Sequence, residues 1–599
     1  MTRQFSTYVR LGVSNVFHVA LYRFLRRAGY YRRLLPIGTP VEGPFFTEAH
    51  DCLPDKVNVS YFSCHEFRLS SPPDWFLNPW NRARHEDTRR HWSELSDFDS
   101  ELGDIKNIWE LSRFDWLPVM AWRYRNGEKK FIRIIENWLR DWCLRNPPNT
   151  GINWKCGQEA ALRCMNMLAA SLCIHDSFHR PLPGFLKFLE VHLERIAPTL
   201  RYAISQDNNH GISEAAALFV AGSYLASYGT KAQRASAGRR AASGRRWLEN
   251  RTEKLIMDDG SFSQHSVTYH RMVLDELCLV ELLRRKLELP PLSGTFYRKT
   301  GKAVKWLDNM VDAASGDAPN LGASDGTFLF NMTGRPYRHF FSSLQLAYAL
   351  FLQKDYRHCH DPHPFMELFD IMAEGLRPQE KPSSVLMKDG GYACIRHERG
   401  FAMLRLPVYR FRPGHADALH LDIWHDGTNW ARDAGTYSYN CDEKLLDYFP
   451  GTAAHSTVEF DRRDQMPRLG RFLYGAWLEP DSIEYEENVM GSGYTDYLGA
   501  CHHRRVVWEN GRWTITDEVS GFAETAVLRW HLPDVGWHLN GKTARCADAD
   551  IEVQSTGVMD MRLVHLPESP CYMKMRHMPV LEIHCRHSCE INTIFTFRD

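Results

Sequence analysis

The chain has 599 residues with 73 basic and 73 acidic side chains, so its formal net charge is zero. This balance argues against a nucleic-acid-binding protein, which normally carries a strong basic excess. The length exceeds what one hydrophobic core supports, so we expect two or three domains. The 15 cysteines are scattered without a Cys-x-x-Cys pair, which favours reduced thiols over a disulfide framework.

Residues 8–34 form a basic, amphipathic segment with no small-residue cleavage site, so we expect no secretory signal. Such a segment is typical of a helix docked on its own domain, and contact with a membrane surface is the alternative. No apolar run approaches the ~20 residues needed to span a bilayer. We therefore expect no transmembrane segment and a cytoplasmic protein, with a periplasmic location or export by another route left open.

Residues 101–380 are predicted to form successive amphipathic helices, because apolar side chains recur at helical spacing between short loops. Serial helical hairpins favour an incomplete α/α toroid. A solenoid is the alternative, but no fixed repeat period is present. Residues 1–100 are expected to form an N-terminal extension packed on the toroid. The predicted helical segments are 108–120, 131–144, 160–174, 185–200, 215–226, 247–257, 272–287, 304–313 and 340–352.

Residues 381–599 are predicted to form an antiparallel β-sandwich, because short alternating segments replace the long helices. The boundary lies in the polar, proline-bearing stretch 377–384. Apolar side chains alternate with His420, Asp422 and Trp424, which predicts a half-buried strand. Asp426-Gly427 then predicts a tight hairpin turn. The sequence therefore indicates an α+β protein with a helical domain followed by a β domain.

Three residues near this hairpin have the side chains of a zinc-like site, namely His415, Asp433 and His455. If the turn has two residues, Asp433 lies nearly opposite His420. The rise per residue of a β-strand then places His415 about 16 Å from that position. Shared ligation therefore requires the chain around Pro413 to curl back, or His420 to be the ligand instead.

Three clusters of polar and aromatic residues stand out in the helical half. An arginine in such a cluster could hold a carboxylate bidentately. Each cluster has an ordinary alternative, since Glu–Arg pairs at i, i+3 are common on helix surfaces and asparagine is a frequent helix N-cap. The clusters are Trp109, Glu110 and Arg113; Asn153, Trp154, Glu159 and Arg163; and Asn209 and His210 with Gln264, Tyr269 and His270.

The stretches GHADALHLDIW (414–424), DAGTYSY (433–439) and AAHSTV (453–458) resemble the C-terminal half of the heparinase II/III family of polysaccharide lyases. The resemblance implies an α/α toroid followed by a β-sandwich that carries a metal-bound His, Asp, His set. It extends to the Asn-Asn-His-Gly and Tyr-His motifs of the helical half. Where the family often has His-x-His-x-Asp, this chain has Pro413 in the first histidine position.

On this resemblance, the protein cleaves a uronic-acid-containing glycan by β-elimination. Asn209 or His210 neutralises the substrate carboxylate, and Tyr269 acts as general base or acid. His415 either takes over the task of the missing histidine or serves only as a metal ligand. The residues expected to bind substrate are Trp109, Glu110, Arg113, Asn153, Trp154, Glu159, Arg163, Gln264, His270 and Tyr437.

The resemblance also implies one divalent metal ion held by His415, Asp433 and His455, with zinc as the first choice and calcium or manganese as alternatives. The expected partner is an acidic polysaccharide, in bacterial surface polysaccharide metabolism for example. A homodimer is left open.

Two other functions compete with the lyase. The first is a glycoside hydrolase of the same architecture, with Glu159 and Asp259 as acid and base. The second is a non-catalytic glycan-binding or assembly protein, which the proline at position 413 favours.

Overall fold

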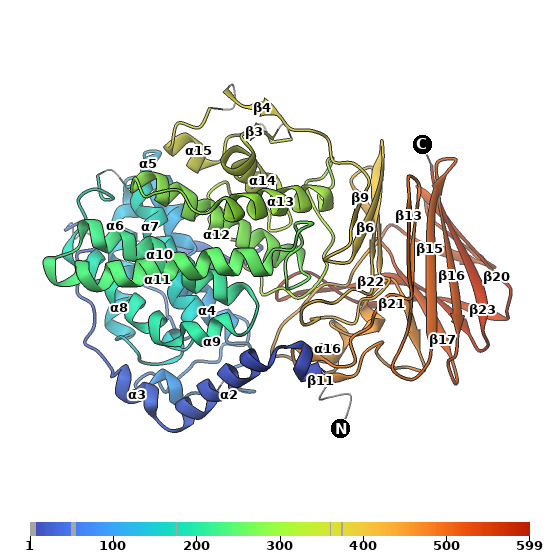
Figure 1. Cartoon of the computed structure of the whole chain (residues 1–599), viewed down its shortest axis with the longest axis horizontal. Helices are drawn as coiled ribbons and strands as arrows, with labels where there is room; N and C mark the ends of the chain where they lie inside the picture. The colour runs from blue at the N-terminus through green and yellow to red at the C-terminus, as the bar shows by residue number, and fades with distance from the viewer. Residues whose placement is uncertain are drawn as a thin grey trace.

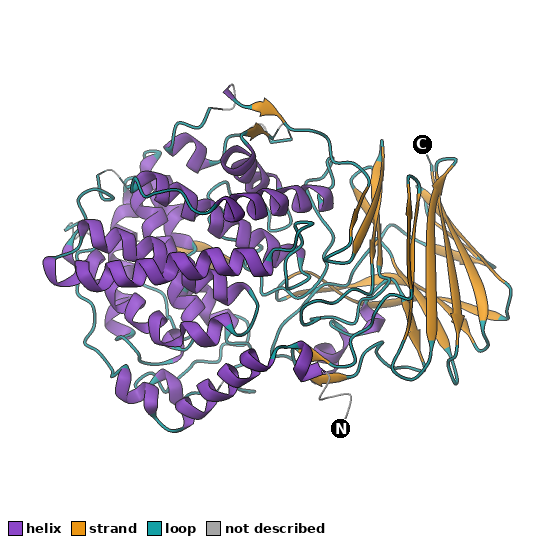
Figure 2. Ribbon diagram, viewed as in Figure 1, coloured by secondary structure: helices purple, strands orange, loops and turns teal. Residues whose placement is uncertain are grey.

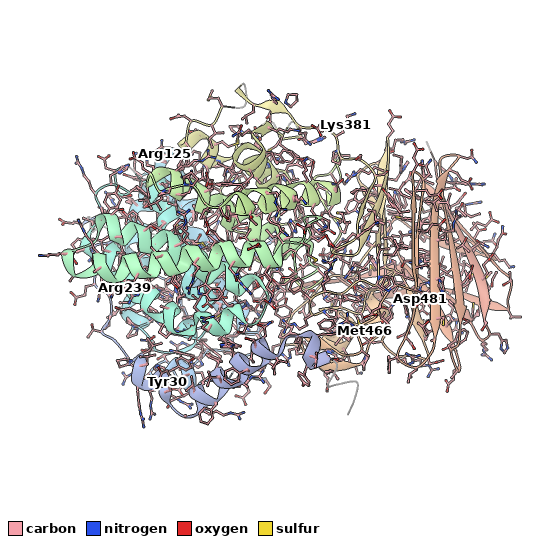
Figure 3. All side chains as sticks on the ribbon, viewed as in Figure 1. Tyr30, Arg125, Arg239, Lys381, Met466 and Asp481 are labelled. Carbon is pink, nitrogen blue, oxygen red and sulfur yellow. A yellow bond between two sulfur atoms is a disulfide. The ribbon has the colours of Figure 1, made fainter. Side chains whose placement is uncertain are left out.

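The computed structural model describes residues 7–48, 56–96, 98–174, 176–356, 358–359, 361–372 and 375–598. Helices form one half of the molecule and β-sheets the other (Figures 1 and 2), and side chains fill the space between them (Figure 3). The predicted order, an incomplete α/α toroid followed by an antiparallel β-sandwich, is confirmed. Among the described residues no helix is both long and apolar enough to cross a bilayer.

The N-terminal segment lies along the helical domain. Helix α2 (Val13–Arg27) and α3 (Tyr30–Leu34) are followed by a hairpin of β1 (Lys56–Tyr61) and β2 (His65–Ser70) and by the short helix η1 (Trp92–Glu94). Backbone N–H groups of Phe45 and Phe46 donate to the buried carboxylate of Glu136, which fixes the segment to the toroid.

A disulfide joins Cys64, in the turn between β1 and β2, to Cys571 in the β domain. The sequence expectation of reduced thiols is therefore wrong for this pair. The two residues are 507 positions apart in the sequence, so spacing gave no sign that folding brings them together.

The toroid consists of helical hairpins that surround α10, which packs against α7, α8, α11 and α12. The predicted segment 108–120 is two helices, because Phe114 adopts a left-handed conformation with φ 69° that ends the first. The helices are α4 (Lys106–Ser112), α5 (Trp116–Arg125), α6 (Lys130–Arg145), η2 (Ile152–Trp154), α7 (Gly157–Cys173), α8 (Pro183–Ile196), η3 (Ala197–Thr199), α9 (Leu200–Ile204), α10 (Asn209–Tyr228), α11 (Lys231–Leu255), α12 (Val267–Lys286), α13 (Gly294–Met310), α14 (Phe341–Ala347), η4 (Tyr348–Leu352) and α15 (Pro364–Leu368).

Side-chain caps begin two of these helices at the domain junction. The Asn208 side chain accepts a hydrogen bond from the N–H of His210 and begins α10. Ser266 accepts from the N–H of Tyr269 and begins α12. Both helices therefore start where the predicted catalytic residues lie.

The β half contains three main antiparallel sheets, in each of which neighbouring strands are named in spatial order. The five-stranded sheet is β5 (Val385–Met387), β6 (Tyr392–His397), β7 (Gly400–Arg405), β8 (Leu421–His425) and β9 (Thr428–Ala431). The four-stranded sheet is β10 (Val458–Phe460), β17 (Ala526–His531), β22 (Lys574–Cys585) and β21 (Met559–Cys571). The eight-stranded sheet is β13 (Ser482–Glu486), β14 (Val489–Thr495), β15 (Cys501–Glu509), β16 (Arg512–Ser520), β23 (Cys589–Phe597), β20 (Ala549–Ser555), β19 (Thr543–Arg545) and β18 (His538–Asn540). Short elements complete the half: α16 (Glu443–Tyr448), η6 (Thr452–Ala454) and the pairs β3 (Lys354–Asp355) with β4 (Arg377–Pro378) and β11 (Arg468–Gly470) with β12 (Leu473–Tyr474).

The five-stranded sheet lies between the toroid and the eight-stranded sheet (Figure 1). Tyr392 and Phe401 pack into the helical core, whereas Ile395 and Leu404 belong to the core of the sandwich. Every residue of β8 is buried, so the predicted half-buried strand is in fact buried on both faces. The polar side chains of β8 are accommodated by hydrogen bonds rather than by solvent.

Candidate active site

Two tyrosine hydroxyl groups meet at the junction of the domains. The hydroxyl of Tyr269, on α12, is 2.9 Å from that of Tyr439, in the segment after β9. The backbone N–H of Tyr439 donates to the carboxylate of Asp104 and to the hydroxyl of Tyr572, which holds its position. Burial raises the pKa of Tyr269 well above its usual value of 10.0, and the charge of Asp325 raises it further. Tyr269 is therefore a protonated phenol at neutral pH and can donate a proton.

The predicted residues Asn209 and His210 form the first turn of α10. The N–H of Asn209 donates to Oε1 of Gln264 at 2.8 Å, which joins two of the predicted motifs. The amide nitrogen of Asn209 is 3.4 Å from the sulfur of Met272, a weak acceptor. Burial lowers the pKa of His210 to about 3, and the positive charge of Lys106 adds to this effect. Without substrate the imidazole of His210 is therefore in its neutral form, and its role beside a substrate carboxylate stays a prediction.

Arg412 was missed by the sequence reasoning and is a cationic side chain beside these residues. It is half-buried, directly before Pro413, and its charge interacts with Tyr269, Tyr439 and His210. Within the described chain its guanidinium group has no ion pair or hydrogen bond. An unpaired, partly accessible arginine beside two phenols is suited to hold an anionic group. Arg412 directly precedes Pro413, which stands in the first histidine position of the family motif. This adjacency is the sequence feature that could have identified it.

Arg113 lies at the centre of a buried ion network beneath these residues. Its guanidinium group donates to Glu159 at 2.8 and 3.1 Å, to Glu110 at 3.1 Å and to Asp325 at 2.9 Å. Arg113 is 0% exposed and Glu159 is 1% exposed. Glu110, Arg113 and Glu159 therefore have partners for their charges inside the protein, which argues against the predicted contact with substrate. Lys106, which donates to Asp325 at 2.8 Å, is the partly exposed member of the network.

Other predicted substrate-binding residues are also structural. Nε1 of Trp109 donates to the carbonyl of Ile152, and the ring is buried. Arg163 donates to a ring nitrogen of His192 at 2.9 Å. The ring of His270 stacks on Trp306 with centroids 4.4 Å apart. These groups have their partners inside the protein. The structure therefore argues against the predicted substrate contacts of four fully buried residues: Asn153, Trp154, Arg163 and His270.

Tyr437 and Tyr439 differ in their surroundings although both lie in the DAGTYSY motif (433–439). The ring of Tyr437 is 6.2 Å from that of Phe449 and packs in a small core of the β domain. The tyrosine that reaches Tyr269 is Tyr439. The structure thus places Tyr439 beside Tyr269, and substrate binding by the half-buried Tyr437 stays a prediction.

The two carboxylates expected in a hydrolase have structural roles. Asp259 accepts from the N–H groups of Ser261 at 3.0 Å and Gly390 at 2.8 Å, and so connects the toroid to the five-stranded sheet. Glu159 is bound to Arg113 in the buried network. This pair therefore provides no acid and base for hydrolysis.

The predicted metal ligands come together in the β domain. One potential ligand atom each from His415, Asp433 and His455 lie within 4.8 Å of one another, and all three residues are buried. Nδ1 of His455 is 2.8 Å from the Asp433 carboxylate. Nδ1 of His415 and Nε2 of His455 are buried without a hydrogen-bond partner. Burial lowers the pKa of His415 to about 4, which keeps the imidazole in the neutral form that binds metals. The residues fit a divalent cation.

The chain before β8 curls back, as ligation by His415 requires. Leu419 is left-handed with φ 56°, and the N–H of Ala416 donates to the carbonyl of Pro450. His420 is excluded as the alternative ligand because both ring nitrogens are occupied. One lies 2.8 Å from the Asp422 carboxylate, and the other accepts from the N–H of Ser456.

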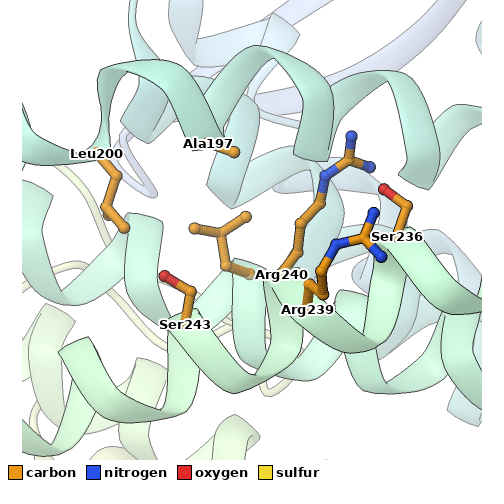
Figure 4. A pocket seen from close by; sticks show the side chains of 7 residues that line it. Ala197, Leu200, Ser236, Arg239, Arg240 and Ser243 are labelled. Carbon is orange, nitrogen blue, oxygen red and sulfur yellow. The ribbon is translucent and has the colours of Figure 1, made fainter.

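Two hollows differ in their relation to this site. One is a gap between the domains that is too small to hold a water molecule; it is lined by Gln264, His265, Gly322, Tyr409, Pro413, Gly414, His415 and Asp417. The other, of about 200 Å³, lies between α11 and the chain around η3 and contains none of the predicted site residues (Figure 4). Its lining includes Arg239 and Arg240. The gap between the domains therefore touches the predicted residues Gln264 and His415, whereas the second hollow lies away from all of them.

Comparison with known proteins agrees with this architecture. Residues 62–310 match the family described as Heparinase II/III N-terminus, and residues 379–569 match Heparinase II/III-like, C-terminal. No curated protein sequence matches significantly. The crystal structure of heparinase III is similar with TM-score 0.63 and 16% identity, over 88% of this chain and 82% of that chain. A mutant of the heparan sulfate lyase HepC from Pedobacter heparinus is similar with TM-score 0.55 and 16% identity, over 97% of this chain and 88% of that chain. With both halves matched in order, the chain belongs to the heparinase II/III family.

Proposed function

We propose that this protein is a polysaccharide lyase that cleaves a uronic-acid-containing glycan by β-elimination. The observation that supports it best is the set of protonation states of three side chains at the domain junction. A protonated phenol, Tyr269, lies near a neutral imidazole, His210, and an unpaired guanidinium, Arg412. These are an acid, a base and a cation, the three groups that elimination next to a carboxylate requires.

The cation makes removal of the C5 proton feasible. While the C6 carboxylate keeps its full charge, the adjacent proton is too weakly acidic to leave. Arg412 is cationic at any physiological pH and can bind both oxygens of a carboxylate. The amide of Asn209 is buried with only the sulfur of Met272 as its partner, so it becomes a second donor where substrate displaces that weak contact. Both stabilise the enolate-like intermediate more than the ground state.

The proton transfers use His210 and Tyr269. A substrate carboxylate beside His210 would raise the pKa of its imidazole above the low value that burial sets, because a nearby negative charge favours the protonated ring. The imidazole of His210 then accepts the C5 proton, and the electrons of the broken C–H bond form the C4–C5 double bond. The C4–O bond breaks at the same time or afterwards, and its oxygen takes the proton of the Tyr269 hydroxyl. Tyr439 orients that hydroxyl through its 2.9 Å hydrogen bond.

We also propose that His415, Asp433 and His455 hold one divalent ion, with zinc as the first choice because two imidazoles and one carboxylate match its preferred ligands. When bound, the ion supplies a cross-link between the chain around Pro413 and the strands of the β domain. That segment carries Arg412. The metal site therefore positions the cation without contacting substrate.

The substrate class follows from the cation and from the family. Two of the similar solved structures are heparinase III and a heparan sulfate lyase, so acidic polysaccharides are the first substrates to test. A bacterial surface polysaccharide is the physiological substrate that we propose. A cytoplasmic location remains a prediction from the sequence.

The test is incubation of the purified protein with a panel of acidic polysaccharides that differ in uronic acid and sulfation. Elimination produces a conjugated double bond, which is followed by ultraviolet absorbance. We expect absorbance to rise with at least one uronate-containing substrate and to stay flat with neutral glucans. New reducing ends without absorbance would instead indicate a hydrolase, and binding without any cleavage would indicate a glycan-binding protein.

A further inference from the structure

Helix α2 presents an apolar stripe to the outside of the molecule. Val13, Phe17, Leu21 and Phe24 are 73, 61, 38 and 66% exposed. Their spacing of four, four and three residues places them on one helix face. No residue of α2 is buried. Large apolar side chains in a continuous exposed row mark an interaction surface rather than ordinary surface variation.

The stripe continues beyond α2 along the same edge of the molecule. Tyr30, Leu34 and Ile37 are 45, 46 and 50% exposed. Tyr30 lies at the outer edge of the structure (Figure 3), and α2 and α3 run along the lower edge in Figure 1. The surface is therefore longer than one helix.

The charges beside the stripe are positive. The first 41 residues contain no aspartate or glutamate. Arg23 and Arg27 are exposed one turn apart on α2, and Arg33 is exposed on α3. None of these three forms an ion pair within the described chain. An apolar face flanked by free arginines is the pattern of helices that lie in the interface of anionic membranes.

The opposite face of α2 is fixed to the toroid near the active site. The amide of Asn15 donates to Asp207 at 2.6 Å, just before the asparagines that begin α10. The rings of Tyr22 and Tyr202 stack with centroids 3.8 Å apart. Tyr202 is also a neighbour of Arg412. The stripe is therefore held outward on a rigid support beside the candidate active site.

We propose that the outer face of α2 and α3 binds an anionic lipid bilayer. Phe17 and Phe24 insert at the level of the headgroups, and Arg23 and Arg27 contact lipid phosphates. A lipid surface is favoured over a second copy of this chain because a symmetric contact would bring the same arginines of both copies together. Binding would place the candidate active site close to glycans at the membrane, and it does not depend on the proposed lyase activity.

The experiment is co-sedimentation of the full chain with vesicles of phosphatidylcholine alone and with vesicles containing one quarter phosphatidylglycerol. We expect binding to the anionic vesicles only, weakened by high salt because the attraction is screened. R23Q/R27Q should weaken binding about 30-fold, since each basic residue near the surface contributes about fivefold. F17S/F24S should weaken it about tenfold or more, because the inserted rings are lost.

The matched control is L144S/V558S, which replaces two apolar residues that are 67 and 88% exposed elsewhere. It should bind vesicles like the unchanged protein. All variants should keep their melting temperature, because every replaced side chain is exposed. Equal binding by F17S/F24S and the control, or no binding to anionic vesicles, would overturn the proposal. A dimer in light scattering that F17S/F24S converts to a monomer, without vesicle binding, would assign the stripe to self-association instead.

Discussion

Tyr269→Phe separates the chemical role of one hydroxyl from its structural role. The substitution removes one hydrogen bond, to Tyr439, and leaves the aromatic ring in place. We expect a stability loss of about 1 kcal/mol, the usual contribution of such a bond. If the hydroxyl is the general acid, kcat should fall by about two to four orders of magnitude. This corresponds to about 3 to 5 kcal/mol of the barrier, far more than the structural effect.

The matched control is Tyr439→Phe, which removes the same hydrogen bond but keeps the Tyr269 hydroxyl. Its kcat should fall by less than about tenfold, because only the orientation of the acid is lost. Both variants are measured by the initial rate of double-bond formation at saturating substrate, beside thermal unfolding. If Tyr269→Phe turns over normally, or if Tyr439→Phe is the more damaging change, Tyr269 is not the acid.

Four further predictions concern the cation, the metal, the buried network and pH. Arg412→Gln should lower kcat/KM by about two orders of magnitude or more, because a preorganised donor to the developing charge is lost. Arg412→Lys should recover part of the activity. Equal kcat/KM values for the unchanged protein and both variants would exclude Arg412 as the group that stabilises the carboxylate. Chelation, or His455→Ala, should lower the melting temperature, and added zinc should restore it only in the chelated protein; less than about a tenth of an equivalent of divalent metal by elemental analysis, with unchanged stability of His455→Ala, would exclude the site. Arg113→Met should destabilise the fold by about 3 to 5 kcal/mol, because it leaves buried carboxylates unpaired; a small change in the denaturation midpoint would contradict the network. Burial lowers the pKa of His270 to about 4, below its ordinary 6.5. Between pH 4 and 6.5 the folded state therefore binds fewer protons than the unfolded state. The free energy of unfolding should fall by about 1.4 kcal/mol for each unit that the pH is lowered through this range. His270→Gln should show a shallower decline of melting temperature over the same range.

The fold could be predicted because its signals are local. Helical periodicity over residues 101–380 and alternation after residue 381 are properties of short windows, and both are present in the structure. The turn at Asp426-Gly427 was predictable for the same reason, and both residues have positive φ. What failed is the burial of β8 on two faces, because it depends on the toroid that packs against it.

The site could be predicted only where residue type restricts the environment. His415, Asp433 and His455 have the ligand types of a metal site, but the choice of His415 over His420 came from the family resemblance, since strand geometry alone left both open. Arg113 and Arg163 were expected at a cleft and are buried with internal partners, since a sequence does not show whether an arginine faces a cleft or the protein interior. Deep burial decides that question, and it arises from contacts between distant segments.

The choice between Tyr437 and Tyr439 illustrates the same limit. The two tyrosines are two positions apart in one motif. In an alternating pattern such residues lie on the same face, so alternation cannot distinguish them. The contact between Tyr439 and Tyr269 spans 170 positions. The neutral state of His210 likewise depends on burial and on the charge of Lys106 across the domain.

The central claim, that the site eliminates rather than hydrolyses, is tested most directly by digestion of a cleaved acidic glycan in water enriched in heavy oxygen. Mass spectrometry of the products then reports whether a solvent oxygen was incorporated at the cut. Elimination predicts unlabelled products, one of which carries the double bond and is lighter than a hydrolysis product by one water. Heavy oxygen in one product of each cut would show hydrolysis and contradict the assignment of Tyr269, His210 and Arg412.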